Sequence, residues 1–284
     1  MNSFTLFNIL AFCTPLESPT EDFSVFFGTS RIVGGVDAPD NHAPYQVALV
    51  FGRESYPSLM CGGSIVSNKH VLTAAHCIDP FVWWDGSLME TLHARVGSNI
   101  WYSGGDVVRF EGYHNHPQWD PYTIKYDVGV LKVSTTDHQE GPLKFSERVR
   151  PIALNYGWVD AGEESFVTGW GLTSVTFIAW GNIPRALQLL KVTTISPKDC
   201  AIGVKEAGQG WITPPVDPHA EICTFHSVGH GMCNGDSGSA LVSLKDRRQL
   251  GLVSWGFPCA VGAPDVYTRL SLPQSKRRPI SQAS

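Results

Sequence analysis

The sequence predicts an all-β fold, a barrel or a sandwich, and two observations support the prediction. The first is a series of short apolar segments of strand length, separated by Gly, Pro, Asn and Asp. They are rich in Val, Ile, Leu and Thr, and examples are residues 45–51, 64–75, 186–196 and 249–256. The second is that few segments keep a helical spacing of apolar residues beyond one or two turns.

Length and composition limit the classes of function. The chain has 284 residues, of which 43% are hydrophobic, enough for one large domain or two small ones. Segment 146–157 carries Pro151 near its centre and is interpreted as a connector between two β-units. The net charge of −5 argues against a nucleic-acid partner. No apolar run approaches the roughly 18 residues of a membrane span, so we expect no membrane partner.

The seven cysteines indicate an oxidising compartment. No two of them form a C-x-x-C pair, which disfavours a zinc ribbon, and six lie in the main body, which suits three disulfides. The seventh, Cys13, ends the apolar run FTLFNILAFC. We therefore expect residues 1–31 to contain a secretory signal peptide. The alternative is a disordered or misassigned N-terminus.

Three motifs carry candidate catalytic residues. His76 lies in LTAAHC, Asp127 in KYDVGVLKV and Ser237 in GDSG. A serine hydroxyl needs a neighbouring base and a third group that orients the base. Singly, each motif has an ordinary explanation: a structural histidine, a turn aspartate and a surface turn. Together they follow one of the known chain orders of a catalytic triad.

Eight motifs in order extend this pattern from Arg31 to about Arg269. They are PYQVAL, CGGSIV, LTAAHC, DVGVL, VTGWG, CNGDSG, VSWG and PDVYTR. On these motifs the chain resembles the trypsin/chymotrypsin family of serine endopeptidases, and insect chymotrypsins most. The resemblance implies two six-stranded antiparallel β-barrels over residues 32–270, with the active site in the cleft between them.

The resemblance also implies a role for each candidate residue. Ser237 attacks the scissile carbonyl, His76 moves its proton, and Asp127 orients the imidazole. The backbone N–H groups of Gly235 and Ser237 form the oxyanion hole. No cofactor or metal is expected, because the stretch that binds calcium in trypsins holds only Asp106 and Glu111 as acids.

The family pattern pairs the six body cysteines as Cys61–Cys77, Cys200–Cys223 and Cys233–Cys259. Some relatives carry a further bridge from the VTGWG region to the strand after the nucleophile. In this chain we assign the two positions of that further bridge to Phe166 and Ser243, so neither position holds a cysteine.

Activation is expected at Arg31, which directly precedes Ile32-Val33-Gly34-Gly35. In the family, cleavage after such an arginine frees an amino group, here that of Ile32. This ammonium pairs with the acid before the nucleophile, here Asp236. A buried charge requires such a partner. The resemblance therefore implies a zymogen in which residues 1–31 hold the signal peptide and a short activation propeptide.

We expect no charged residue at the position that forms the floor of the primary specificity pocket in the family. That position corresponds to Gly231, and Ser254, Trp255 and Gly256 form an open wall. This favours cleavage after large apolar or aromatic residues. Asp265 lies near the floor, and two alternatives stay open: it attracts Arg or Lys of the substrate, or it points away and binds nearby backbone.

Two features depart from the family. The nucleophile is followed by Gly238-Ser239-Ala240, where the family has Gly-Gly-Pro. Residues 271–284 form a polar tail with Pro273 and Pro279, where relatives have an amphipathic helix containing a tryptophan. We expect a modest effect of Ser239, and a less stable fold where that helix is missing.

The sequence thus predicts a secreted, monomeric, chymotrypsin-like serine endopeptidase that acts in digestion. Its expected partners are protein or peptide substrates, an activating protease and protein inhibitors. One alternative is a non-catalytic homologue that binds a partner. The other is a trypsin-like processing or immune protease, against which Gly231 and the short propeptide argue.

Overall fold

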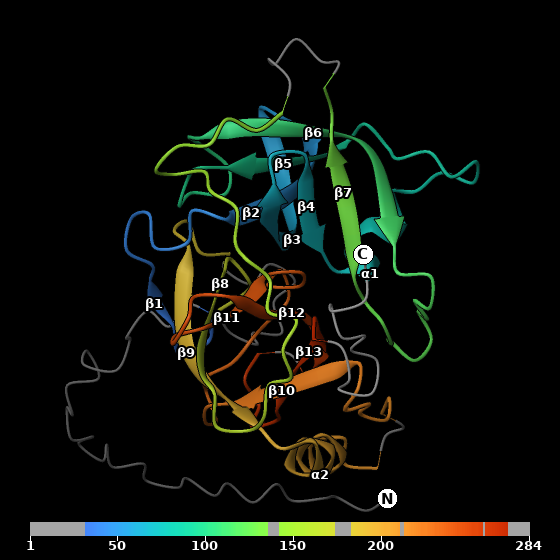
Figure 1. Ribbon diagram of the computed structural model, residues 1–284, viewed down its shortest axis with the longest axis vertical. Coiled ribbons are helices and arrows are strands. Elements are labelled where there is room, and N and C mark those ends of the chain that lie inside the picture. Colours follow the sequence, from blue (N-terminus) through green and yellow to red (C-terminus); the bar gives the residue numbers. More distant parts are fainter. Residues whose placement is uncertain (1–31, 136–141, 174–182, 211–212, 258, 272–284) are drawn as a thin grey trace, which may run out of the picture.

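The computed structural model describes residues 32–135, 142–173, 183–210, 213–257 and 259–271. Their strands form two antiparallel β-barrels, which lie one above the other in Figure 1. Helices are few and short in this part of the chain. Both the all-β prediction and the two-barrel expectation are confirmed. None of the helices in the described ranges is long and apolar enough to cross a membrane.

The first barrel closes in the order β2-β3-β4-β7-β6-β5. Its strands are β2 (Gln46–Arg53), β3 (Tyr56–Ser67), β4 (His70–Thr73), β5 (Leu92–Val96), β6 (Asp106–Asn115) and β7 (Gly129–Val133). Side chains alternate between the two faces of a strand. In β2, Val47 and Leu49 therefore fill this barrel, while Ala48 and Val50 pack in a cluster with residues of the second barrel.

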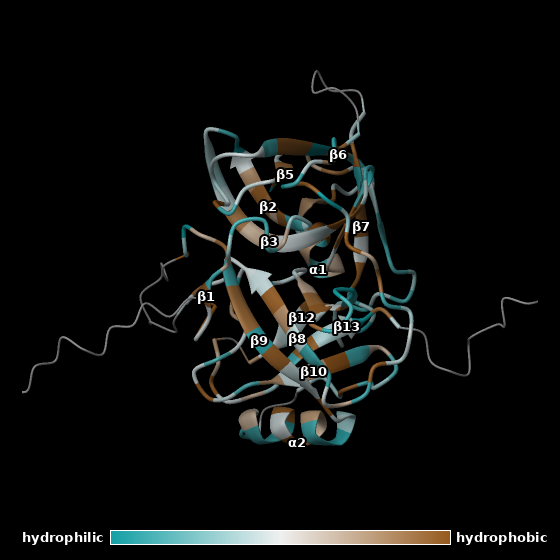
Figure 2. Cartoon of the chain, turned by 60° about the vertical axis from the view of Figure 1, so that its left-hand side comes forward, coloured by the Kyte–Doolittle hydropathy of each residue, from teal (hydrophilic) through white to brown (hydrophobic). Residues whose placement is uncertain are grey.

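The second barrel closes because β8 pairs with both β9 and β11. Its strands are β8 (Glu164–Gly169), β9 (Gln188–Ile195), β10 (Glu221–Phe225), β11 (Ala240–Ser243), β12 (Gln249–Gly256) and β13 (Asp265–Arg269). The short strand β1 (Val36–Asp37) adds to the edge of β9. Hydrophobic residues recur along these strands (brown in Figure 2), and a cluster of them is buried in this barrel.

Three short helices complete the described structure: α1 (Ala75–Ile78), η2 (Asp79–Phe81) and α2 (Pro197–Ala207). Helix α2 lies at the end of the second barrel (Figures 1 and 2). Its N-cap Ser196 accepts a hydrogen bond from the N–H of Asp199 at 3.1 Å, and Pro197 occupies the first turn. The sequence analysis did not identify this helix, although Ser-Pro-x-Asp is a helix-start signal.

The cysteines pair as Cys61–Cys77, Cys200–Cys223 and Cys233–Cys259. The assignment of Phe166 to the missing fourth bridge was wrong by one residue. Ser243 lies opposite Ser165 in the β8–β11 ladder, and Phe166 lies opposite Val242. A shift of one residue moves a side chain to the other face of a strand, and Phe166 is buried in the core.

A buried glutamine joins the two barrels. Gln46 of β2 accepts a hydrogen bond from Thr168 Oγ1 at 2.8 Å, and its Nε2 donates to Ser239 Oγ at 3.2 Å. All three residues are buried. Ser239 thus lies in close contact with the first barrel, where a Cβ on Gly62 would come within 2.0 Å of its Oγ. The hydroxyl at this departure from the family pattern has a hydrogen-bond partner.

Replacing Gln46 by alanine should lower the free energy of unfolding by about 2–4 kcal/mol, because it opens a cavity and removes partners from two buried hydroxyls. Denaturant unfolding measures the change. The exposed Gln118 is the matched control, and its Gln118→Ala substitution should change the value by less than about 0.5 kcal/mol. Equal effects of the two substitutions would contradict a role for Gln46 in joining the barrels.

Candidate active site

The pairing of β4 with β7 brings His76 and Asp127 together. Thr73 at the end of β4 lies opposite Gly129 at the start of β7. His76 follows β4 in α1, and Asp127 precedes β7, so both residues lie at the same edge of the first barrel. His76 Nδ1 is 2.7 Å from Asp127 Oδ2, and the backbone N–H of His76 donates to Oδ1 at 3.0 Å.

The second barrel also binds Asp127, which is fully buried. Ser254 Oγ donates to Oδ2 at 2.6 Å, and Thr268 Oγ1 donates to the backbone oxygen at 2.8 Å. The carboxylate therefore receives the proton of His76 Nδ1, which leaves Nε2 as the basic nitrogen. The sequence analysis placed Ser254 only in the pocket wall and did not identify Thr268, because neither has a local signal for this contact.

Ser237 lies in a turn that contacts the first barrel. Its carbonyl accepts a hydrogen bond from the N–H of Gly62 at 2.7 Å, and the N–H of Gly238 donates to Val253 at 2.8 Å. Gly238 has φ +80°, and a Cβ there would lie 2.2 Å from Thr73 Oγ1. A side chain at this position would therefore push the turn away from the end of β4, three residues before His76.

The hydroxyl of Ser237 is partly exposed, as is the ring of His76, whose side chain is 33% exposed. Within the described residues no hydrogen bond joins these two side chains. Such bonds are commonly long in a free enzyme and tighten in the substrate complex.

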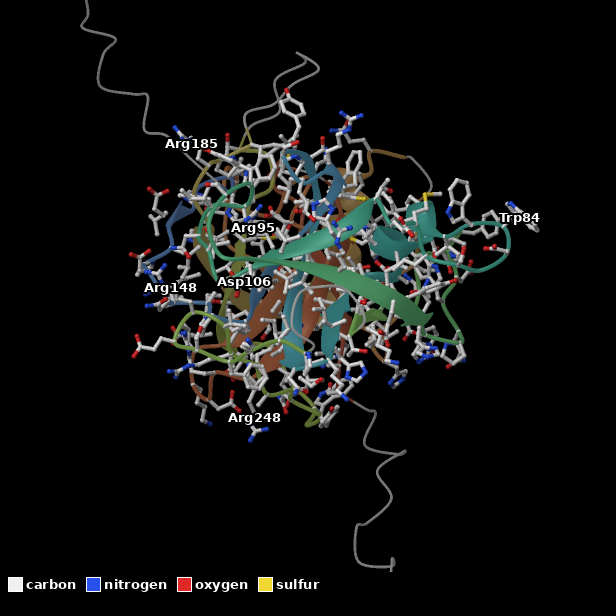
Figure 3. All side chains as sticks on the ribbon, turned by 90° about the horizontal axis from the view of Figure 1, so that it is seen from above. Trp84, Arg95, Asp106, Arg148, Arg185 and Arg248 are labelled. Carbon is white, nitrogen blue, oxygen red and sulfur yellow. A yellow bond between two sulfur atoms is a disulfide. The ribbon has the colours of Figure 1, made fainter. Side chains whose placement is uncertain are left out.

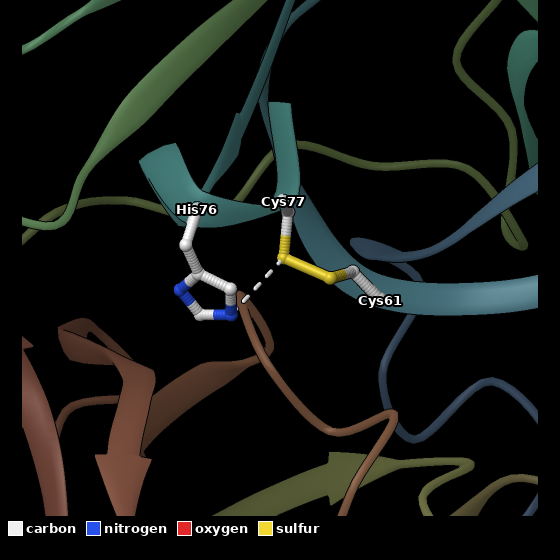
Figure 4. A group of neighbouring side chains, drawn as sticks. All are labelled: Cys61, His76 and Cys77. Carbon is white, nitrogen blue, oxygen red and sulfur yellow. Dashed lines mark hydrogen bonds between the residues drawn. A yellow bond between two sulfur atoms is a disulfide. The ribbon is translucent and has the colours of Figure 1, made fainter. Parts of the chain in front are cut away.

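The disulfide Cys61–Cys77 lies beside the imidazole (Figure 4), with Cys77 Sγ 3.8 Å from His76 Nε2. Each of these three residues offers one atom of a type that can bind a metal, and the three atoms all lie within 4.8 Å of one another. Cysteine binds a metal as a thiolate, however, and both sulfurs here are bonded to each other. The bridge instead ties the α1 segment to β3.

The backbone before Ser237 is open to a ligand. Gly235 has φ +100°, a conformation that favours glycine, and a Cβ there would lie 3.2 Å from the Cα of Gly171. The N–H groups of Gly235 and Ser237 find no acceptor among the described residues. Two unpaired donors beside a serine hydroxyl can bind a developing oxyanion.

A cavity of about 120 Å³ adjoins Ser237. Its lining includes Ser254, Trp255, Gly256 and Asp265. Asp265 also accepts a hydrogen bond from the N–H of Met232 at 3.2 Å, so it both lines the cavity and binds backbone. Burial raises the pKa of Asp265 to about 7, against the lowering effect of that hydrogen bond. Gly231 lies behind this acid, where a Cβ would come 3.0 Å from its Oδ2.

Asp236 is fully buried on the other side of the turn. It accepts hydrogen bonds from the N–H groups of Gly171 at 2.8 Å and Cys233 at 3.0 Å. Burial nevertheless raises its pKa to about 7. Ile32 is buried in the core of the same barrel, and its backbone has φ +38°. Arg31 lies outside the described residues.

The loop between η2 and β5 extends away from the barrels and carries Trp83 and Trp84. Trp84 is 95% exposed and stands at the tip of this loop in Figure 3. Asp79, at its base, accepts hydrogen bonds from Asn115 Nδ2 and Trp119 Nε1, both at 2.7 Å. These bonds tie the segment after His76 to the loop that leads to Asp127.

Comparisons with known proteins agree with this geometry. A family model described as Trypsin matches residues 32–275. Chymotrypsin-2 of Vespa crabro is 33% identical over 240 residues, which cover 84% of this chain and 94% of that protein. Trypsin alpha-4 of Lucilia cuprina is 34% identical over 238 residues, 84% of this chain and 82% of that protein. The two-barrel fold, the matched family model and these relatives together show that the chain belongs to the trypsin family of serine endopeptidases.

Proposed function

We propose that the chain hydrolyses peptide bonds with Ser237 as nucleophile, His76 as general base and acid, and Asp127 as the orienting carboxylate. The 2.7 Å contact between His76 Nδ1 and the fully buried Asp127 carries this proposal. It fixes the tautomer that leaves Nε2 free to accept a proton. The cavity beside Ser237 supplies a place for the substrate side chain.

The reaction follows from these positions. Ser237 Oγ attacks the scissile carbonyl carbon as its proton passes to His76 Nε2, and Asp127 stabilises the imidazolium. The N–H groups of Gly235 and Ser237 bind the oxyanion. The intermediate then collapses, the C–N bond breaks, and His76 returns the proton to the leaving amine. Water repeats the sequence on the acyl-enzyme and releases the acid product.

Substituting Ser237 by alanine should lower kcat by about 10⁴-fold or more, because no other hydroxyl is activated by His76. The measurement is peptide hydrolysis together with covalent labelling by an active-site phosphonate. Ser146→Ala, at an exposed serine, is the matched control and should keep both signals. A folded, activated parent that neither cleaves nor labels would support a non-catalytic binding homologue instead.

We propose further that cleavage after Arg31 activates the enzyme by freeing the amino group of Ile32 to pair with Asp236. Before cleavage, Asp236 is buried with two N–H donors and no cation among the described residues. Its folded-state pKa of about 7 lies above its ordinary 3.8. The uncleaved chain therefore loses stability as pH rises from about 4 through about 7. An ammonium beside Asp236 removes this penalty and orders the turn that holds Ser237.

Arg31→Gln should block activation by limited trypsin treatment, whereas the exposed Arg53→Gln should leave it intact. Asp236→Asn should be cleaved after Arg31 yet remain nearly inactive, because the freed ammonium lacks its carboxylate. N-terminal sequencing gives the cleavage, and phosphonate labelling gives the active fraction. Full activity of uncleaved Arg31→Gln protein would rule out this form of activation.

The pocket supports a preference for large apolar or aromatic residues before the scissile bond, with Arg or Lys as additional substrates. Gly256 leaves the cavity open and Asp265 contributes an acid to its lining, whereas Gly231, expected at the floor, is not among the lining residues. The two named relatives are a chymotrypsin and a trypsin. A trypsin-like processing protease is therefore the second candidate function, and it is favoured by the position of Asp265.

The ratio of kcat/KM for an Arg substrate to that for a Phe substrate should rise about tenfold from pH 6 to pH 8, as a group with a pKa near 7 becomes charged. The ratio cancels any pH dependence of the chemical steps that both substrates share. Asp265→Asn should make the ratio independent of pH. Asp246→Asn, at an exposed aspartate, should leave the pH dependence of the ratio as it is in the parent. A parent ratio without pH dependence would show that Asp265 does not contact the substrate.

Secretion, a role in digestion, a monomeric state and control by protein inhibitors complete the proposal. Three disulfides in the described structure support an oxidising compartment. As a serine endopeptidase the protein acts on polypeptide substrates. The boundary of the signal peptide and the polar tail beyond Ser271 lie outside the described residues.

A further inference from the structure

Glu221, the first residue of β10, is a buried acid away from the triad. Its side chain is 2% exposed. Oε1 accepts hydrogen bonds from Lys125 Nζ and from Trp255 Nε1, both at 2.7 Å, and Oε2 accepts one from the N–H of Asp217 at 2.7 Å. Both carboxylate oxygens therefore have donors, as a buried charge requires.

Lys125 reaches this acid from the first barrel. Its side chain is 12% exposed, and its Nζ lies 5.0 Å from the centroid of the Trp255 ring. The ammonium therefore contacts the carboxylate and one face of the indole at the same time. Trp255 is fixed by a hydrogen bond at its edge and by a cation over its ring.

The backbone around Lys125 is strained. Ile124 and Tyr126 both have φ +54°, in the left-handed region that a β-branched or bulky residue rarely adopts. Lys125 also exchanges two backbone hydrogen bonds with Asp120, at 3.1 and 3.3 Å. Such a conformation persists only where the surroundings hold it, and the ion pair with Glu221 is one of these restraints.

Lys125 and Trp255, which both contact Glu221, each lie next to residues of the proposed active site. Asp127 follows Lys125 by two residues, so the strained segment leads directly into the triad. Trp255 follows Ser254, which donates to Asp127, and Trp255 lines the cavity beside Ser237.

We propose that Glu221 and Lys125 are positioning residues that hold Trp255 as a wall of the substrate-binding site. They link this wall to the segment before Asp127 and thereby set the binding of extended peptides across the two barrels. The inference rests on the proposed function of Ser237 and the cavity beside it.

The chain offers a matched control. Lys132 and Glu111 form an ion pair at 2.5 Å within the first barrel, where the lysine side chain is 54% exposed. Lys132→Met removes the same charge as Lys125→Met at a place that touches neither Trp255 nor the triad.

The test compares kcat and KM of the activated full chain on two substrates, a tetrapeptide amide and p-nitrophenyl acetate. The ester reaches Ser237 without lying along Trp255. Lys125→Met should raise KM for the peptide on the order of tenfold with kcat within about twofold, because it removes ground-state and transition-state binding alike. Ester hydrolysis should not change, because Asp127 keeps its own hydrogen bonds to His76 and Ser254 when Lys125 is replaced. Lys132→Met should behave as the parent on both substrates.

The double variant Lys125→Met/Glu221→Gln separates positioning from stability. It leaves no unpaired buried charge, so its unfolding midpoint should exceed that of Lys125→Met. Its peptide KM should stay raised, because no cation covers the indole. Should Lys125→Met alone fail to fold, the double variant carries the test.

Phosphonate labelling of Ser237 distinguishes a failure of the proposed function from a failure of this inference alone. An activated, folded parent that is not labelled would overturn the proposed function and this inference with it. A labelled parent whose peptide KM is unchanged in both variants would overturn the inference alone. A loss that affects peptide and ester equally would also overturn it, because that pattern indicates general destabilisation.

Discussion

The buried carboxylate of Asp127 is the constraint on which the proposed active site depends. It receives three hydrogen bonds, two from His76 in the first barrel and one from Ser254 in the second. A charge in a medium of low dielectric constant is tolerated only when such donors surround it. Separating the two barrels would therefore remove the Ser254 donor from this buried charge, so the carboxylate that orients the imidazole also restrains how the barrels pack at the cleft.

Asp236 and Asp265 differ from Asp127 in this respect. Each is buried with backbone N–H donors but with no cation among the described residues, and the pKa of each is raised to about 7. Their charges also oppose each other, since Asp236 raises the pKa of Asp265. A site with two such acids favours binding of positive charge. The N-terminal ammonium and the basic substrate side chain that we propose are two cations that would fit this arrangement.

Much of this could be predicted from the sequence, because the information was local. Apolar segments of strand length indicated β-structure, and short motifs marked His76, Asp127 and Ser237. The features that were not predicted include the helix α2, the alignment of Ser165 rather than Phe166 with Ser243, and the pairing of Lys125 with Glu221. The last two depend on strand register and on contacts between residues far apart in the chain. The helix did have a local signal in Ser196 and Pro197, which the predominance of strand-like segments obscured.

Buried polar contacts cross between the barrels at several places, and they include those of Gln46, Ser64, Asp127 and Glu221. Apolar contacts between the barrels supply attraction, but they are non-directional and permit small relative shifts. Hydrogen bonds require defined distances and angles, and a buried donor or acceptor without its partner is costly. The polar contacts therefore determine the alignment of the barrels, and with it the distance between the nucleophile turn and the histidine. Catalysis at this cleft requires positions accurate to a fraction of an ångström, which the polar contacts can impose and the apolar contacts alone cannot.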